Sequence, residues 1–393
     1  MDKKVEERLA TITEHLVSYP TVDGNNRDLH GCVDWVKTRV LTQSPRLDIR
    51  GFCSHDKPSL LFSAGKTSPK VLFCGHLDVV EAPKPEFTAS IVGASRMRGR
   101  GTADMKGPIA AMIDIITTEP IPGLGLLLTT DEEVGGENGV YHVLHNLDWR
   151  PDVVVLPDGG ANMRLVGEQK GILRLRLVAK GGGAHGSRPW LSNNPIVTIQ
   201  RAYDALLRAY PMPKEDEDWR VSISLTELHA GVAPNSIPWH AEATLDIRFP
   251  DTGEGTWEKL LVDIRRRLNR YGVNAEVVAN SPGFKLDSAV PAVRQMQDVA
   301  QYVTGKPLPV VREAGASDAR YFSSEGIPVI MFQPECGNWH GADEWVDLES
   351  LVMFRTMCTS FARSVLGRDR GVYQVAHAQR KTRASAHKRS AAI

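Results

Sequence analysis

The chain has few cysteines and no excess of either charge. Its five cysteines are odd in number, scattered, and include no CxxC pair. We therefore expect reduced, mostly buried thiols rather than a disulfide framework. The 47 basic residues are balanced by 47 acidic residues, so the overall charge favours neither a nucleic acid nor an anionic membrane as a partner.

Long hydrophobic runs are also missing. No stretch approaches the ~18 consecutive apolar residues of a membrane span. The N-terminus instead predicts an amphipathic helix, because apolar residues recur at helical spacing between Val5 and Leu16. It lacks the uninterrupted apolar core of a signal peptide. We expect a cytoplasmic protein with no membrane partner.

The 393 residues, 42% of them apolar, can bury a large core, and this length favours two domains. Short apolar runs bounded by turn residues at 71–74, 124–128 and 152–156 predict buried strands of a mostly parallel sheet. A helix is predicted at 108–117, with a proline in its first turn. The alternation of strands and helices indicates an α/β domain.

The pattern changes near Gly167. Residues 171–180 alternate apolar and basic side chains, which is typical of a sheet with one face in water. The chain from here to about residue 284 therefore predicts a smaller α+β insertion, after which the α/β pattern resumes. The other predicted elements of the insertion are helices at 195–210 and 254–271 and strands at 221–228, 241–249 and 275–279. Those that follow it are helices at 291–304 and 348–366 and a strand at 329–332.

The predicted fold class is α/β, with a mostly parallel sheet flanked by helices and an inserted α+β domain. The first domain is discontinuous and comprises residues 1–168 and 285–367, while the insertion comprises 169–284. The tail, 368–393, carries seven Lys or Arg residues against one acid. It is predicted to be disordered and solvated, with contact to nucleic acid as the minority alternative.

Histidine and acidic side chains gather where the predicted strands end. His76 and Asp78 are two residues apart on an extended chain and face the same side, although for this pair taken alone a structural histidine with a satisfied carboxylate neighbour is the favoured alternative. Asp104 lies in a glycine-rich loop before a helix. That loop lacks the third glycine of a dinucleotide fingerprint, which leaves an acid at a helix N-terminus as the alternative.

Three adjacent acids, Asp131, Glu132 and Glu133, directly follow another predicted strand. Like charges repel unless a cation or basic side chains compensate them, and a solvated acidic turn is the alternative. Asp158 follows the next strand, and His340 lies in a glycine-flanked loop.

Together these positions indicate a metal site. Oxygen donors and neutral imidazoles without a thiolate cluster suit Zn²⁺, Co²⁺ or Mn²⁺ in an open catalytic site. Two histidines and four or five carboxylates are too many ligands for one zinc ion. They suggest two divalent ions about 3.5–4 Å apart.

These motifs (VLFCGHLDVV, GRGTADMKG, TTDEEVGG, PDGG and GNWHG) occur in an order that resembles one known family. It is the di-zinc metallopeptidase family of acetylornithine deacetylase, succinyl-diaminopimelate desuccinylase, aminoacylase and glutamate carboxypeptidase. The resemblance covers residues 5–367. It implies that His76 and Asp158 ligate one ion, that Glu133 and His340 ligate the second, and that Asp104 bridges both.

The resemblance also implies catalytic roles. Glu132 would be the general base that activates water, and Asp78 would orient His76. The insertion would be a lid that forms a homodimer, and His185, in the segment AHGSRPW, would polarise the scissile carbonyl in the partner's site. A surface turn histidine is the alternative for His185.

Three further residues are implied to bind substrate. Asn235, in GVAPNSIP, would contribute to the oxyanion pocket. Arg248 and Arg320 would bind substrate carboxylates, for which the guanidinium fork is well suited. Arg248 could equally pair with a local acid such as Asp246.

The implied function is metal-dependent hydrolysis of an amide bond in an N-acyl amino acid or short peptide with a free carboxylate. Deacetylases and desuccinylases of this family typically have glutamate and proline where this chain has Asp158 and Gly159, so a dipeptidase or carboxypeptidase is the alternative. A catalytically silent dimeric scaffold would require loss of Glu132 or of a ligand, and none is lost. A nucleotide-binding enzyme would require a phosphate-binding fingerprint that the sequence lacks.

Overall fold

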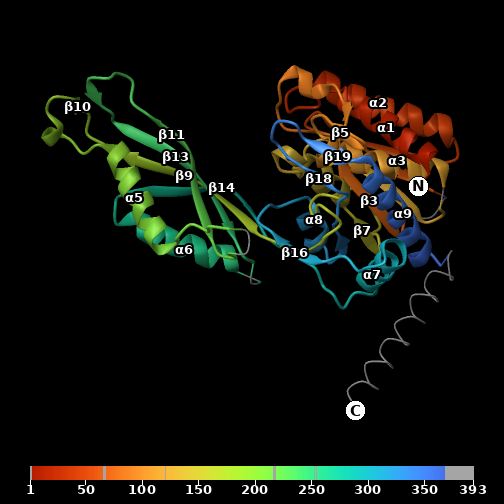
Figure 1. The fold of residues 1–393 in the computed structure, drawn as a ribbon. Coiled ribbons are helices and arrows are strands. Elements are labelled where there is room, and N and C mark those ends of the chain that lie inside the picture. Colours follow the sequence, from red (N-terminus) through yellow and green to blue (C-terminus); the bar gives the residue numbers. More distant parts are fainter. Residues whose placement is uncertain are drawn as a thin grey trace, which may run out of the picture. The chain divides into compact units, whose positions relative to one another are not determined.

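The computed structural model confirms the α/β fold class, with a mixed, mostly parallel sheet and separate antiparallel sheets (Figure 1). The chain divides into two compact units. The first unit contains Met1–Val166, Leu286–Val311 and the chain from Ser317 onward, and the second contains Gly167–Lys285 and Arg312–Ala316. The structure describes residues 2–64, 68–119, 121–215, 218–251, 253 and 255–367. The predicted disordered tail, 368–393, lies outside them.

A six-stranded sheet in the order β1-β2-β6-β3-β7-β17 forms the centre of the first unit. Strands β6, β3, β7 and β17 are parallel, whereas β1 and β2 add an antiparallel edge. Every residue of β3 and β6 is buried, as their continuous apolar runs predict. The bounds are β1 Asp48–Ser54, β2 Lys57–Ser63, β3 Val71–His76, β6 Leu124–Thr129, β7 Val153–Val155 and β17 Val329–Ile330.

Helices surround this sheet. α3 (Gly107–Thr118) is mostly apolar and is buried from Gly107 to Thr117, because it packs on β6 and also contacts α1, α2 and α9. Its proline lies in the first turn, where a missing N–H costs nothing. The other helices of this unit are α1 Lys3–Val17, α2 Asn26–Gln43, α4 His142–His145, α7 Pro291–Thr304, α8 Ala319–Ser324 and α9 Leu348–Val365.

A small antiparallel sheet, β18-β19-β5-β4, was not predicted. Its strands are β4 Ser90–Val92, β5 Arg96–Arg98, β18 Cys336–Gly337 and β19 Trp345–Asp347. Arg98 pairs with Trp345. The glycine-rich loop that follows Arg98 therefore lies beside the loop that precedes Trp345.

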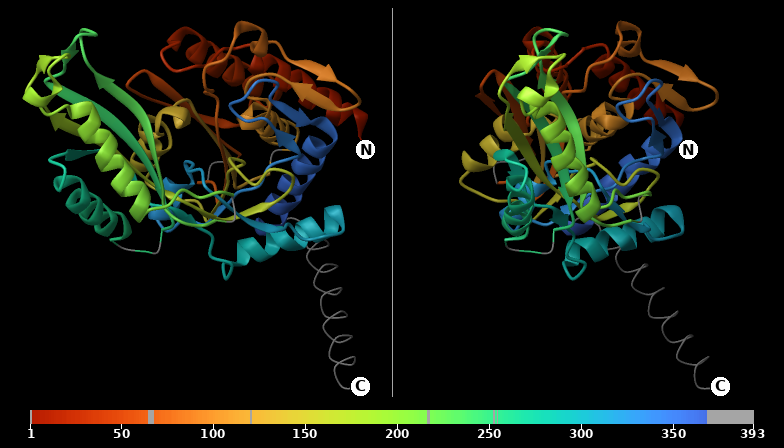
Figure 2. Two further views of the ribbon diagram at one scale, coloured as in Figure 1. Left: turned by 60° about the vertical axis from the view of Figure 1, so that its left-hand side comes forward. Right: turned by 90° about the vertical axis from the view of Figure 1, so that its left-hand side faces the viewer.

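The second unit is built on the antiparallel sheet β11-β13-β9-β14. Alternate residues of β13 are buried, and helices α5 and α6 pack against the sheet (Figures 1 and 2). The bounds are β9 Gly171–Lys180, β11 Ser222–Ala230, β13 His240–Phe249, β14 Asn274–Ser281, α5 Pro195–Ala209 and α6 Thr256–Asn269. A two-stranded ribbon joins β10 (Ala184–His185) to β12 (Ser236–Ile237). A three-stranded sheet contains β15 Phe284–Lys285, β8 Leu165–Gln169 and β16 Val310–Glu313, and the first two residues of β8 and of β16 are assigned to the first unit.

All five cysteines fall within the described residues. They form no disulfide, and only Cys53 is exposed. No helix in the described part of the chain has the length and apolar character needed to cross a membrane.

Candidate metal centre

The residues predicted to hold metal lie together in the first unit. His76 is the last residue of β3, the acids 131–133 follow β6, and Asp158 follows β7. Since these strands are parallel, their carboxyl ends meet at one edge of the sheet. Asp104 comes from the turn before α3, and His340 from the loop between β18 and β19.

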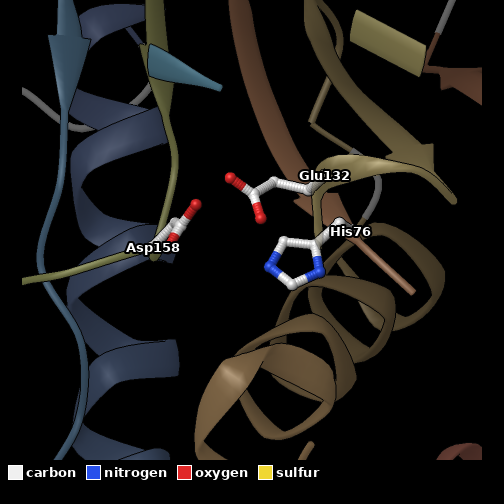
Figure 3. Close-up of side chains that lie close together, drawn as sticks. All are labelled: His76, Glu132 and Asp158. Carbon is white, nitrogen blue, oxygen red and sulfur yellow. The ribbon is translucent and has the colours of Figure 1, made fainter. Parts of the chain in front are cut away.

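His76, Glu132 and Asp158 form the first group of potential ligands. One ligand atom from each lies within 4.8 Å of the others, and Figure 3 shows both carboxylates reaching toward the space beside the imidazole. The His76 Nδ1 lies 3.0 Å from the main-chain oxygen of Asp78. With the proton on Nδ1, the lone pair of Nε2 is available to a metal.

Asp104, Glu133 and His340 form the second group, again with ligand atoms within 4.8 Å of one another. The His340 Nε2 lies 3.2 Å from Asp104 Oδ2 and 3.3 Å from Glu133 Oε1. The other oxygen of Asp104, Oδ1, lies 3.2 Å from His76 Nε2. One carboxylate thus presents a different oxygen to each group.

The electrostatics of the centre are those of a cation site. Desolvation, followed by the charge of Asp158, raises the pKa of Glu132 well above its ordinary value. Desolvation and then Asp104 do the same for Asp158, whose Oδ2 is buried without a hydrogen-bond partner among the described residues. Buried carboxylates crowded in this way are costly unless positive charge compensates them. The oxygen and imidazole donors therefore fit two divalent ions.

The surroundings of His340 also favour positive charge. The carboxylates of Asp104 and Glu133 raise its pKa to about 10. Burial opposes the ionised form of Asp104, but hydrogen bonds from His340 and His76 outweigh it and lower the pKa of Asp104. A metal ion would replace the proton on His340, because a histidine ligates in its neutral form.

Asp78 contacts both groups. Its Oδ1 lies 3.6 Å from His76 Nδ1, farther than its own main-chain oxygen. Its Oδ2 accepts a hydrogen bond of 3.0 Å from the N–H of Glu133. Asp78 therefore touches His76 mainly through its backbone, while its carboxylate holds the turn that carries Glu133.

Arg320 has protein partners. Its guanidinium is buried and donates to the carbonyl of Gly135 at 2.6 Å and to that of Ser317 at 3.3 Å. The hydroxyl of Tyr321 donates to the same Gly135 carbonyl. Arg320 therefore braces the turn that follows Glu133, and its binding of a substrate carboxylate stays a prediction.

The remaining predicted residues belong to the second unit. His185 is exposed on β10, with Nδ1 2.8 Å from Ser187 Oγ. Asn235 is close by, since its carbonyl accepts the N–H of Gly186. Arg248, on β13, donates to Asp246 at 2.7 Å, which is the local pairing considered as its alternative.

Three buried residues near the predicted ligands were missed. Glu344 and Arg100 form an ion pair beside Asp104, and desolvation raises the pKa of buried Asp318 to about 7. Each of the three lies within a few residues of a predicted site residue, and Arg100 belongs to the same motif as Asp104. Glu344 is four residues after His340, and Asp318 precedes Arg320 by two. Proximity in sequence was the only signal that could have found them.

Comparison with known proteins identifies the family. Residues 72–364 match the model of peptidase family M20/M25/M40. Succinyl-diaminopimelate desuccinylase from Alkalilimnicola ehrlichii is 27% identical over 77% of this chain and 86% of its own length. The enzyme of the same name from Methylobacterium radiotolerans is 32% identical over 75% and 82%.

A solved tripeptidase from Staphylococcus aureus has the same fold, with a TM-score of 0.72, 20% identity, and coverage of 93% of this chain and 99% of that one. The family match spans both units and all the predicted metal ligands. The chain thus belongs to peptidase family M20/M25/M40 and is a metallohydrolase of amide or peptide bonds.

Proposed function

We propose that this metallohydrolase uses two zinc ions to cleave the amide bond of an N-acyl amino acid or short peptide with a free carboxylate. The observation that carries the proposal is the placement of Asp104, whose two oxygens face His76 and His340. We assign His76 and Asp158 to one ion, Glu133 and His340 to the other, and Asp104 to both. Co²⁺ or Mn²⁺ would suit the same donors.

The chemistry supplied by two divalent ions here is Lewis acidity, which polarises an amide carbonyl and acidifies water. A carboxylate oxygen of Glu132 would take a proton from the attacking water as the new carbon–oxygen bond forms. The same carboxyl group would return that proton to the amine nitrogen as the carbon–nitrogen bond breaks. Asp78 would keep His76 and the Glu133 turn in place. His340, whose side chain is 52% exposed, leaves one side of the centre open to substrate.

A peptidase is the alternative to an N-deacylase. It is favoured by the aspartate and glycine at positions 158 and 159 and by the likeness to the tripeptidase. The desuccinylase relatives favour a deacylase. We place the enzyme in the cytoplasm on the sequence features alone.

A substrate panel with and without a chelator tests the proposal. We expect hydrolysis of at least one N-acyl amino acid, dipeptide or tripeptide, and loss of that activity after metal removal, because water at neutral pH is a poor nucleophile without a Lewis acid. Added Zn²⁺ should restore it. Substrates with the carboxylate converted to an amide are the controls and should react more slowly. Undiminished hydrolysis by metal-free protein would contradict the proposal.

We also propose a homodimer formed through the second unit, with His185 acting in the partner's site. The exposed imidazole supports this, as do the large exposed side chains of the same unit, among them Trp190 (76% exposed) and Trp239 (70%). Tryptophan side chains are enriched in the cores of protein–protein interfaces.

Mixing two inactive variants tests the shared site. His185→Ala and Glu132→Ala chains should each be inactive alone. After subunit exchange, an equimolar mixture should recover up to about a quarter of wild-type activity, because about half of its dimers are mixed and one of the two sites in each mixed dimer has both residues. Each variant mixed with itself is the control. Activity that stays at the level of the single variants, despite measured subunit exchange, would argue that each chain uses its own His185.

A further inference from the structure

We infer that Arg100 and Glu344 are positioning residues that set the affinity of the second metal position, the one made by Asp104, Glu133 and His340. Their buried ion pair ties the loop of Asp104 to the loop of His340. The inference rests on the proposed two-ion centre, and it adds a pair of residues that do not touch the ions.

The backbone brings the two residues together. Strands β5 and β19 pair, with Arg98 opposite Trp345, and just beyond the ladder the N–H of Gly99 donates to the carbonyl of Glu344 at 2.9 Å. Arg100 and Glu344 therefore leave the same end of the small sheet, although 244 residues separate them.

The carboxylate of Glu344 holds the loop that leads to Asp104. Its Oε2 accepts hydrogen bonds from Arg100 Nη1 (2.6 Å) and the N–H of Gly101 (2.9 Å). Its Oε1 accepts those from the N–H groups of Ala103 (2.9 Å) and Asp104 (3.0 Å). Glu344 is only 1% exposed, so these four donors take the place of water. The main chain of Asp104 is thereby fixed directly.

Arg100 extends this bracing to His340. While Nη1 binds Glu344, Nη2 donates to the carbonyl of Gly341 at 3.1 Å. Gly341 follows His340, which has a φ of +58°. Asn338 and Asp343 in the same loop also have positive φ, +61° each. A histidine in this conformation costs about 1 kcal/mol or more, whereas Asn and Asp adopt it more readily, so the backbone at His340 depends on outside contacts to keep this shape.

The pair acts unequally on the two metal positions. The second position takes both Asp104 and His340 from braced loops. The first takes His76 and Asp158 from the ends of β3 and β7, which the central sheet holds, and shares only Asp104 with the braced loop. Loosening the pair should therefore weaken binding of the second ion far more than the first. A merely structural ion pair would lower stability without distinguishing between them.

The test is Zn²⁺ binding by Glu344→Gln, measured by equilibrium dialysis of the full chain with metal analysis. The amide has nearly the same shape, but its nitrogen cannot accept, so two of the four donors lose their acceptor whichever way it turns. We expect the second dissociation constant to rise at least about tenfold, which is 1.4 kcal/mol, and the first to change less than about threefold.

Asp343→Asn is the matched control. It removes an ion pair with Arg98 that joins the same two segments, but whose side chains are 38% and 59% exposed. Exposed pairs contribute little, and asparagine tolerates positive φ, so both dissociation constants should stay within about twofold.

Arg100→Lys is the second test variant, because a lysine keeps the charge but cannot offer the two-pronged contact to Glu344 and Gly341. Thermal unfolding in chelator checks that each variant folds without metal. If Glu344→Gln does not fold, Arg100→Lys decides.

The inference would be overturned if the variants bound both ions equally more weakly, or if folded variants bound them as the wild-type chain does. Loss of folding in both test variants would also overturn it. If the wild-type chain binds no zinc, the proposed function itself is wrong. If the wild-type chain and the variants bind two ions equally well, the inference is wrong but the proposed function stands.

Discussion

Replacing Asp104 by alanine is expected to release both metal ions and to reduce kcat/KM by at least about a thousandfold, since several kcal/mol of transition-state stabilisation would be lost with the ions. The reason is the shared carboxylate, which presents one oxygen to His76 and the other to His340. Without Asp104, each of the two proposed ions would keep only two of its assigned protein ligands. Metal analysis of the purified variant and kinetics on the best panel substrate measure the effect.

The control for this variant is Asp152→Ala. Asp152 is an exposed acid just before β7, at the opposite end of the strand from Asp158. The Asp152→Ala protein should retain two ions and normal turnover. An Asp104→Ala protein that still carries two ions would show that the carboxylate does not bridge.

The second large effect is expected from Glu132→Gln, which should keep about two ions and lower kcat by about 10²–10⁴-fold. The amide preserves the size of the side chain but cannot take a proton from water. Metal content and kcat are measured on the same sample. Glu137→Gln, an exposed residue in the next turn, is the control and should leave both unchanged.

This variant also separates two roles for Glu132. The structure groups its carboxylate with His76 and Asp158 within 4.8 Å, a distance compatible with a ligand as well as with a base. Loss of one ion in Glu132→Gln would identify a ligand. Full metal content with low turnover would identify the base.

The parallel strands of the main sheet, and the gathering of His and acidic side chains at their ends, were accessible to prediction for one physical reason, whereas the antiparallel strands β1 and β2 were not predicted. Buried parallel strands such as β3 and β6 are continuous apolar runs, so they stand out in the sequence. Residues that follow such strands must meet at one edge of the sheet. Finding the strands therefore also found His76, the acids 131–133 and Asp158.

The small sheet left no comparable signal. Its strands have two or three residues, too few to show any periodicity. Because that sheet was missed, the pairing of Arg100 with Glu344 was missed too. The contacts of Arg320 were equally hidden, since its partners are main-chain carbonyls and every residue has one.

The pairing of Arg98 with Trp345 also bears on the order in which the protein matures during synthesis. The ribosome makes the loop of Asp104 early, but its partner Glu344 follows 240 residues later, after the whole second unit. At ~5–20 residues per second, translation alone separates them by roughly 12–48 s. A nascent chain can present His76, Glu132 and Asp158 well before His340 exists, so the proposed second metal position cannot be completed until the loop that carries His340 and Glu344 has been made.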